Sequence, residues 1–191
     1  SSSYPSLSYT QNCIALSIRS HYGSHPYCLR IDSAVLSIAW EETMLNISEI
    51  RHLAELELHC SVDQLTDFLY THLDRFRDDK NAIQKAIAYV FSVDPGKGGF
   101  ILLAMDSGAL AGALIMINTG MQEFIPENTL VYIAVDSAKR GQGIGKQLIY
   151  HAQKVCKGNI ALHVEYDNPA KRLYERLGFS SKYAEMRWSR D

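Results

Sequence analysis

The 191-residue sequence has no long apolar run and no excess of charge of one sign. Its longest strictly apolar stretches, such as residues 100–105, fall far short of the roughly 18–20 residues that a membrane-spanning helix requires. Nineteen Lys and Arg residues against twenty-one Asp and Glu residues give a formal net charge of −2, which supplies no general attraction to nucleic acid or to an anionic membrane. We therefore expect a soluble protein that binds neither, so any phosphate site must be local.

Cysteine is also scarce and dispersed. The chain has four cysteines, and no two form a CxxC pair: Cys13, Cys28, Cys60 and Cys156. This spacing excludes a disulfide-rich scaffold and favours free thiols in a reducing cytoplasm. Together with His21 and His25, the first two cysteines offer zinc-ligand types within a short segment. The intervening residues look like strand and turn, and the usual close cysteine pair is missing, so we predict no metal site.

Charged residues are few in the first part of the chain. Ten of residues 1–43 are serine, and short strand-like runs occur at 13–18, 27–31 and 35–40. Over the whole chain the apolar fraction of 47 % and the charged fraction of 21 % are ordinary for a globular protein of one domain. We expect residues 1–43 to be a Ser-rich extension with peripheral strands and residues 44–191 to be the functional domain. In an alternative interpretation the functional chain begins at Met44.

Residues 47–91 carry a helical pattern. Ser48 is a candidate N-cap for a first helix that runs to the neighbourhood of Cys60. Ser61 and Gln64 have the spacing of a capping box, and an apolar stripe to residue 76 predicts a second helix behind it. Asp78 or Asp79 caps a third helix, which ends at the glycine-rich turn 94–99.

The second half of the chain has a strand pattern with helices inserted. Residues 100–105 and 110–118 predict a hairpin, and 130–135 predict a central strand covered on both faces. A helix from about Gly143 to Lys157 and an alternating strand from Ile160 complete a β-α-β unit. Asn168 opens a short helix that ends at Gly178, and 179–188 predict a final strand or pair. The fold class is therefore α/β, with a mixed, twisted sheet and helices on both faces.

Residues 135–146, between the central strand and the following helix, are the most informative segment. Glycines at 141, 143 and 145 permit a tight turn and let a ligand approach the main chain, and the unpaired N–H groups of a helix start favour phosphate. Arg140 and Lys146 add positive charge. The segment favours a diphosphate ligand, although a plain strand-to-helix turn would use the same glycines.

Two common nucleotide motifs fit this segment poorly. A Walker A loop requires Ser or Thr where this chain has Gln147, and Arg140 stands in the place of its first glycine. A dinucleotide fingerprint requires a third glycine where Lys146 stands, although Glu165 lies about where the ribose-binding acid would be. Hydrolysis of ATP or GTP is disfavoured, and the match to dinucleotide binding is only partial.

A third pattern fits without a mismatch. Arg140, Gly143 and Gly145 have the spacing of R/Q-x-x-G-x-G/A, and this loop resembles the acetyl-CoA pyrophosphate loop of the GNAT superfamily of N-acetyltransferases. Downstream, Asn168, Tyr174 and the Gly178-Phe179 pair are similar to the superfamily's N-x-x-A-x-x-x-Y-x-x-x-G-F segment, with Ala170 nearer to Asn168 than in some members. The resemblance runs from Met44 onward, roughly three quarters of the chain, and it implies a GNAT-like sheet and acetyl-CoA as co-substrate.

The resemblance also implies roles for individual residues. Main-chain groups at Val135 would bond the pantetheine arm as an added strand would, and Asn168 would help to position that arm. Tyr174 would donate a proton to the departing thiolate, although its spacing equally suits a packed helix residue. The residues implied to hold the diphosphate are Arg140, Gly141, Gln142, Gly143, Ile144, Gly145 and Lys146.

The implied reaction is direct attack of a primary amine, from a small molecule or a peptide, on the thioester of acetyl-CoA. An amine with a pKa near 10 must lose a proton before it attacks. Glu127 is the candidate base, with Glu123, Asp136, His163 and Glu165 left open. We expect helices within 61–91 and the loop 119–128 to wall the acceptor site, and a homodimer is compatible with the sequence. The alternative is a non-catalytic module that binds CoA or a nucleotide.

Overall fold

The computed structural model describes residues 45–190. The Ser-rich extension, its expected strands and the zinc candidates Cys13, His21, His25 and Cys28 lie outside the described residues.

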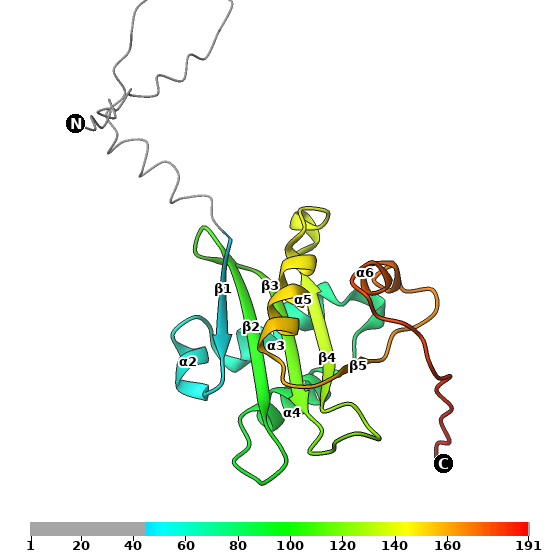
Figure 1. The fold of residues 1–191 in the computed structure, drawn as a ribbon. Coiled ribbons are helices and arrows are strands. Elements are labelled where there is room, and N and C mark those ends of the chain that lie inside the picture. Colours follow the sequence, from blue (N-terminus) through cyan, green and yellow to red (C-terminus); the bar gives the residue numbers. More distant parts are fainter. Residues whose placement is uncertain (1–44, 191) are drawn as a thin grey trace, which may run out of the picture.

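A single five-stranded sheet organises the described chain, with its strands in the order in which they occur in the sequence (Figure 1). The strands are β1 (Asn46–Ile50), β2 (Gly99–Asp106), β3 (Ala109–Asn118), β4 (Asn128–Val135) and β5 (Ile160–Leu162). Neighbours pair antiparallel from β1 to β4, whereas β4 and β5 are parallel. The predicted mixed sheet, the hairpin and the β-α-β unit are thus confirmed.

The hairpin between β2 and β3 closes through a two-residue turn. Asp106 pairs with Ala109 across Ser107 and Gly108, and both turn residues have a positive φ, of 51° and 78° respectively. A turn of this kind follows the right-handed twist of the two strands. The hairpin therefore fixes the register of the two most buried strands of the sheet.

Helices cover both faces of the sheet, as predicted (Figure 1). On one face, α3 (Val62–His72) and α4 (Lys80–Val90) bury Leu65, Leu69 and Ile83 in an apolar cluster. On the other face, α5 (Ile144–Val155) buries Leu148 and Ile149 in a second cluster. The smaller helical elements are α2 (Leu53–Glu57), η1 (Asp74–Phe76), η2 (Ser137–Lys139) and α6 (Lys171–Arg176).

The prediction that a helix begins at Ser48 is wrong. Residues 46–50 form β1, which pairs with β2, and Ile47 and Ile50 pack into the clusters on opposite faces of the sheet. Side chains that alternate between faces are the mark of a strand. The helix begins only at Leu53, where Glu55 accepts hydrogen bonds from the Arg51 and His52 N–H groups at 2.7 and 3.1 Å.

The C-terminal part also differs from expectation. No strand lies within residues 179–190 of the described chain. Helix α6 begins at Lys171 with Ala170 as its N-cap, so Asn168 is not the cap. The Asn168 carboxamide oxygen instead accepts the Ala170 N–H at 2.9 Å, in the turn that precedes the helix. Gly178 does end α6, with a φ of 90°.

Candidate functional site

Strands β4 and β5 pair over only part of the length of β4. Their register covers Asn128↔Ile160, Thr129↔Ala161 and Leu130↔Leu162 and stops there. Residues 132–135 of β4 pair with β3 on one side and have no strand partner on the other side within residues 45–190. The C-terminal half of β4 therefore has one edge that pairs with no strand of the sheet, and we call this its free edge.

The register with β3 shows which main-chain groups face this free edge. The Asp136 N–H donates to the Ala111 carbonyl oxygen at 2.9 Å, so Asp136 and Ala134 lie at the hydrogen-bonded positions of the antiparallel pair. The N–H and C=O groups of Val135 and Ile133 consequently point away from β3. The sequence indicated Val135 and missed Ile133, although the two-residue period of a strand would have found it.

The loop after β4 presents a run of peptide N–H groups without protein acceptors. Gly143 is the N-cap of α5 and supplies no side-chain cap. The Gln147 N–H donates to the Gly143 carbonyl at 3.0 Å, and within the described chain none of the N–H groups of residues 141–146 has an acceptor. Gly141 and Gly143 have φ values of 80° and 84°, with no other atom near the place of a Cβ. These are the features of an anion-binding helix start.

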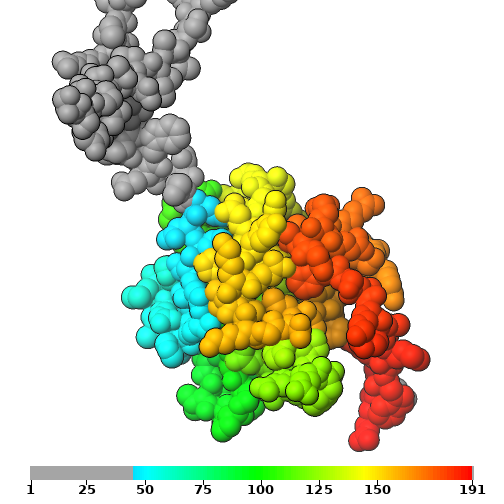
Figure 2. All heavy atoms as spheres, in the orientation of Figure 1, coloured from blue at the N-terminus to red at the C-terminus, as the bar shows by residue number. Residues whose placement is uncertain are grey.

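Two other glycines bring the surrounding elements together. A Cβ on Gly112 of β3 would lie 2.9 Å from the Ile144 side chain, so its absence lets the first turn of α5 rest on the sheet. A Cβ on Gly145 of α5 would lie 3.4 Å from the Leu173 side chain and 3.6 Å from the Val135 side chain. Helix α6 therefore lies beside the start of α5, and Figure 2 shows the two segments adjoining on this face.

Arg140 points elsewhere than the resemblance suggested. Its guanidinium donates to the His72 carbonyl oxygen at 2.6 Å and, at 3.4 Å, to the Val135 carbonyl oxygen. The side chain is thus anchored to the end of α3 rather than extended beside the free N–H groups. His72 also accepts the Ser137 N–H at 3.1 Å through Nδ1. No sequence signal marked His72, because its partners lie far along the chain.

Tyr174 lies in the second apolar cluster, with 7 % of its surface exposed. Its ring meets the Phe179 ring edge to face, with centroids 5.9 Å apart. Its hydroxyl has no hydrogen-bond partner among the described residues. Burial raises the pKa of Tyr174 to about 12, so the phenol keeps its proton at neutral pH. The ring is packed as one of the two interpretations predicts, and the hydroxyl is left as an uncommitted proton donor. The role of Tyr174 as catalytic acid stays a prediction.

Asn168 and Lys146 occupy the margins of the same region. The Asn168 oxygen is engaged by Ala170, and its amide N–H₂ group donates to no described residue. The Lys146 ammonium lies 5.5 Å from the centre of the Tyr150 ring, on the exposed side of α5. Both side chains therefore keep donors that a bound anion or amide could use.

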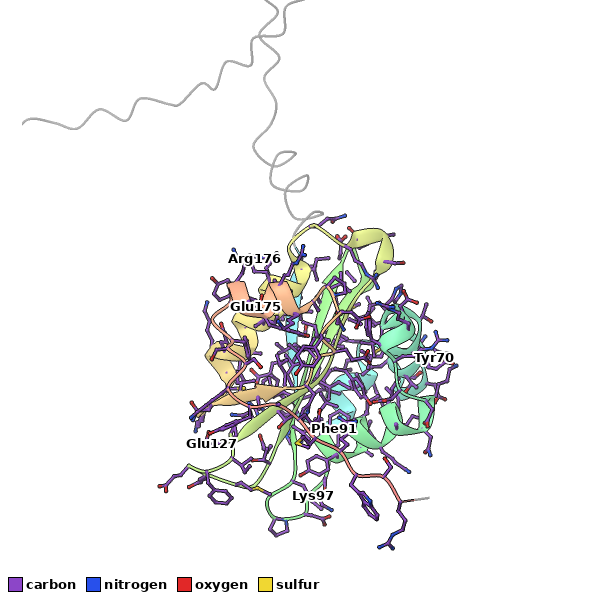
Figure 3. All side chains as sticks on the ribbon, turned by 90° about the vertical axis from the view of Figure 1, so that its right-hand side faces the viewer. Tyr70, Phe91, Lys97, Glu127, Glu175 and Arg176 are labelled. Atoms are coloured by element: carbon purple, nitrogen blue, oxygen red, sulfur yellow. The ribbon has the colours of Figure 1, made fainter. Side chains whose placement is uncertain are left out.

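Glu127 lies at the opposite end of β4. The strand separates it from Val135 by about 25 Å at 3.3 Å per residue, and Figure 3 shows it far from Glu175 and Arg176 of α6. Its carboxylate accepts the Asn159 N–H at 2.7 Å, and this bond lowers the pKa of Glu127. The structure therefore does not bring Glu127, Glu123 or the loop 119–128 to the glycine loop.

The remaining candidate bases lie nearer to the free edge. Asp136 directly follows Val135, and its carboxylate accepts the Ala138 N–H at 3.0 Å. His163 and Glu165 follow the end of β5 and are exposed. Neither a cluster of metal-ligating side chains nor a helix long and apolar enough to cross a membrane occurs in residues 45–190.

Comparisons with known proteins agree with this geometry. A family model described as "Acetyltransferase (GNAT) family" matches residues 53–179. No curated protein sequence matches the chain.

Solved structures share the fold at low identity. A possible acetyltransferase from Clostridium difficile 630 aligns with a TM-score of 0.56 and 17 % identity, over 78 % of this chain and 98 % of that chain. An aminoglycoside N-acetyltransferase AAC(6')-Iy in complex with CoA gives 0.56 and 16 %, over 78 % and 95 %. A ribosomal-protein-alanine N-acetyltransferase from Brucella melitensis biovar Abortus 2308 gives 0.53 and 18 %, over 76 % and 99 %.

Proposed function

The chain belongs to the acetyltransferase (GNAT) family, and on that premise we propose that it transfers an acetyl group from acetyl-CoA to a primary amine. The acceptor is a small molecule or a peptide with a free amino group. The domain responsible is residues 44–191, and the free thiols of Cys60 and Cys156 suit a reducing, cytoplasmic setting.

One observation carries the proposal. The free N–H groups of residues 141–146 lie directly after the unpaired edge of β4. A helix start with unused donors suits a diphosphate, and an unpaired strand edge suits an extended arm that carries amides. Acetyl-CoA has both parts in that order, and neither ATP nor an inorganic anion has the second. The fit therefore favours this co-substrate over a nucleotide.

We assign the chain's own groups as follows. The peptide N–H groups of residues 141–146 bind the diphosphate, with Lys146 nearby as a counter-charge. The main-chain groups of Ile133 and Val135 hold the pantetheine amides, and Asn168 supports the arm. Arg140 holds the loop through its bonds to the Val135 and His72 carbonyl oxygens, and its remaining guanidinium N–H groups are left to bind phosphate.

The reaction is a direct transfer. The neutral amine attacks the thioester carbonyl carbon, the carbon–sulfur bond breaks, and CoA leaves as the thiol. Tyr174 supplies the proton to the sulfur, because its phenol is neutral at pH 7 and its hydroxyl is uncommitted, and the phenolate then takes a proton back from water. The amine loses its own proton to a base or to water, for which Asp136 and Glu165 are better placed than Glu127.

The solved neighbours support an acceptor that carries an amine. Two of them are named for acceptors that carry an amine, an aminoglycoside and a ribosomal-protein alanine. A screen of aminoglycosides, polyamines, amino acids and peptides, followed by release of the CoA thiol, identifies the acceptor. A preference for acceptors without an amine would contradict the proposal.

Replacing Tyr174 by Phe tests the mechanism. We expect kcat to fall roughly 10- to 1000-fold with little change in the affinity for acetyl-CoA, because the ring keeps its packing and only the proton donor is lost. Tyr70→Phe, on the outer side of α3 (Figure 3), is the matched control. An unchanged kcat in Tyr174→Phe would remove the residue from the mechanism.

A non-catalytic module that binds CoA or a nucleotide is the competing outcome. Titration calorimetry with acetyl-CoA, NAD and ATP separates it from the proposal. We expect acetyl-CoA to bind and neither NAD nor ATP to bind at a comparable concentration. Binding of NAD in preference to acetyl-CoA, or acetyl-CoA binding without turnover of any amine, would favour the module.

A further inference from the structure

Residues 136–140 form a corner between β4 and the glycine loop, and this corner is held from three directions. The Asp136 N–H bonds to β3 through the Ala111 carbonyl at 2.9 Å. The Lys139 ammonium donates to the carboxylate of Asp106, the last residue of β2, at 2.6 Å. The third support comes from His72 at the end of α3. The corner is therefore fixed before any ligand binds.

His72 contacts both ends of η2 within this corner. Its Nδ1 atom accepts the Ser137 N–H at 3.1 Å, and its carbonyl oxygen accepts the Arg140 guanidinium at 2.6 Å. A backbone N–H that donates to Nδ1 requires an unprotonated nitrogen there, so the neutral ring carries its hydrogen on Nε2. The ring also packs against Phe68, with centroids 4.6 Å apart, and the side chain is only 16 % exposed. Its orientation is thereby restricted.

The loop that follows has little other support. Gly141 and Gly143 have no neighbouring atom near the place of a Cβ, and the N–H groups of residues 141–146 make no bond to the described chain. Residues 144–146 already belong to α5, whose first turn rests on the sheet through the buried Ile144. The direction of the N–H groups of residues 141–143 is therefore set where the loop leaves the corner, at Arg140. On the side of α3, the bonds nearest to Arg140 are the two that His72 accepts, from the Ser137 N–H and from the Arg140 guanidinium.

We propose that His72 is a positioning residue for the diphosphate loop. Its imidazole and its carbonyl oxygen hold Ser137 and Arg140, and so fix the direction of the N–H groups that follow. The proposal rests on the proposed function, because it assigns His72 to the binding of acetyl-CoA. It also links α3, on the opposite face of the sheet from α5, to the geometry of the loop.

Substitution of His72 separates its acceptor atom from its packing. His72→Phe keeps a ring against Phe68 and removes the acceptor, whereas His72→Asn offers a carboxamide oxygen near the position of Nδ1. We expect His72→Phe to raise the Kd for acetyl-CoA about three- to tenfold, the equivalent of one ordinary hydrogen bond. His72→Asn should keep the Kd within about twofold of the wild type. His59→Phe, an exposed histidine at the end of α2, is the control.

A kinetic readout distinguishes positioning from general damage. At saturating acetyl-CoA, His72→Phe should keep kcat within about twofold while KM for acetyl-CoA rises with Kd. A structural defect spread through the fold would lower kcat as well. If His72→Asn lost as much affinity as His72→Phe, the acceptor atom would not be the cause and the proposal would be overturned.

Hydrogen exchange in the free protein tests the same contact without acetyl-CoA. The Ser137 amide should exchange faster in His72→Phe than in the wild type, and at the wild-type rate in His72→Asn. Failure of the wild type to bind acetyl-CoA would overturn the proposed function, whereas equal Ser137 exchange rates in all three proteins would overturn the role of His72. The two failures are thus distinguishable.

Discussion

Helices α3 and α5 begin in opposite ways. The N-cap Ser61 of α3 accepts the Gln64 N–H at 3.1 Å, and the Gln64 side chain accepts the Ser61 N–H at 2.8 Å. At the start of α5, Gly143 supplies no side chain, and no described residue accepts the N–H groups of residues 141–146. One helix start has its N–H donors satisfied by its own side chains, and the other leaves its donors free.

Under the proposed function, the chain gives up stability for binding at the start of α5. A side-chain cap contributes about 1 kcal/mol to the free energy of unfolding, and α5 lacks one. The proposed binding of a diphosphate by the loop with glycines at 141, 143 and 145 would explain the omission, because a capping oxygen would occupy the place of a phosphate oxygen. The same principle applies along β4, whose paired half is structural and whose unpaired half is open to a ligand.

The largest effect is expected when α5 is given an acidic N-cap, which removes its difference from α3. We expect Gly143→Asp to weaken acetyl-CoA binding on the order of 100-fold, because a carboxylate at the helix start repels the diphosphate and competes for its donors. Gly143→Asn is the matched control, since both residues tolerate a positive φ and only one is charged. Calorimetric titration measures both affinities.

The outcome of that pair decides between charge and shape. A loss of affinity that is equal in Gly143→Asp and Gly143→Asn would mean that repulsion by the carboxylate charge does not matter, and that space, backbone strain or the capping oxygen causes the loss. Unchanged affinity in Gly143→Asp would place the diphosphate elsewhere.

The reverse change removes the cap of α3. Ser61→Ala should lower the free energy of unfolding by about 1 kcal/mol, measured by urea denaturation, because the Gln64 N–H loses its acceptor. The affinity for acetyl-CoA should not change, since α3 uses its donors internally. A loss of affinity as large as that of Gly143→Asn would show that the two helix starts are not independent.

The smallest effect is expected at the paired end of β4. Glu127→Gln should leave kcat within about twofold of the wild type, because its carboxylate bonds Asn159 and lies far from the loop. Steady-state assays with the identified acceptor measure this. A large fall in kcat without a change in melting temperature would restore Glu127 as the base.

Local patterns in the sequence were sufficient for much of this structure. The capping box of Ser61 and Gln64 is confirmed, since its partners are three residues apart, and so is the uncapped glycine start of α5. The strand at 46–50 could not be predicted in the same way. Ile47, Ile50 and Leu53 are compatible with a helical period, and only pairing with β2 decides in favour of a strand.

The spacing of residues in the sequence does not predict contacts between distant parts of the chain. Arg140 bonds the carbonyl of His72, 68 positions earlier, so the motif could not show where its guanidinium points. The free edge at Ile133 depends on where β5 stops pairing, which is a property of the whole sheet. Its residue type makes Glu127 a candidate base, and its distance from the loop follows only from the length of β4.

The most direct test of the account is the amide NMR spectrum of the protein with and without acetyl-CoA. The account predicts that the largest shifts fall on the N–H groups of residues 141–146 and of Val135, with the N–H of Gln64 in the capped start of α3 unchanged. If acetyl-CoA binds while the amide chemical shifts of residues 141–146 stay unchanged, the claim that these N–H groups bind its diphosphate is contradicted.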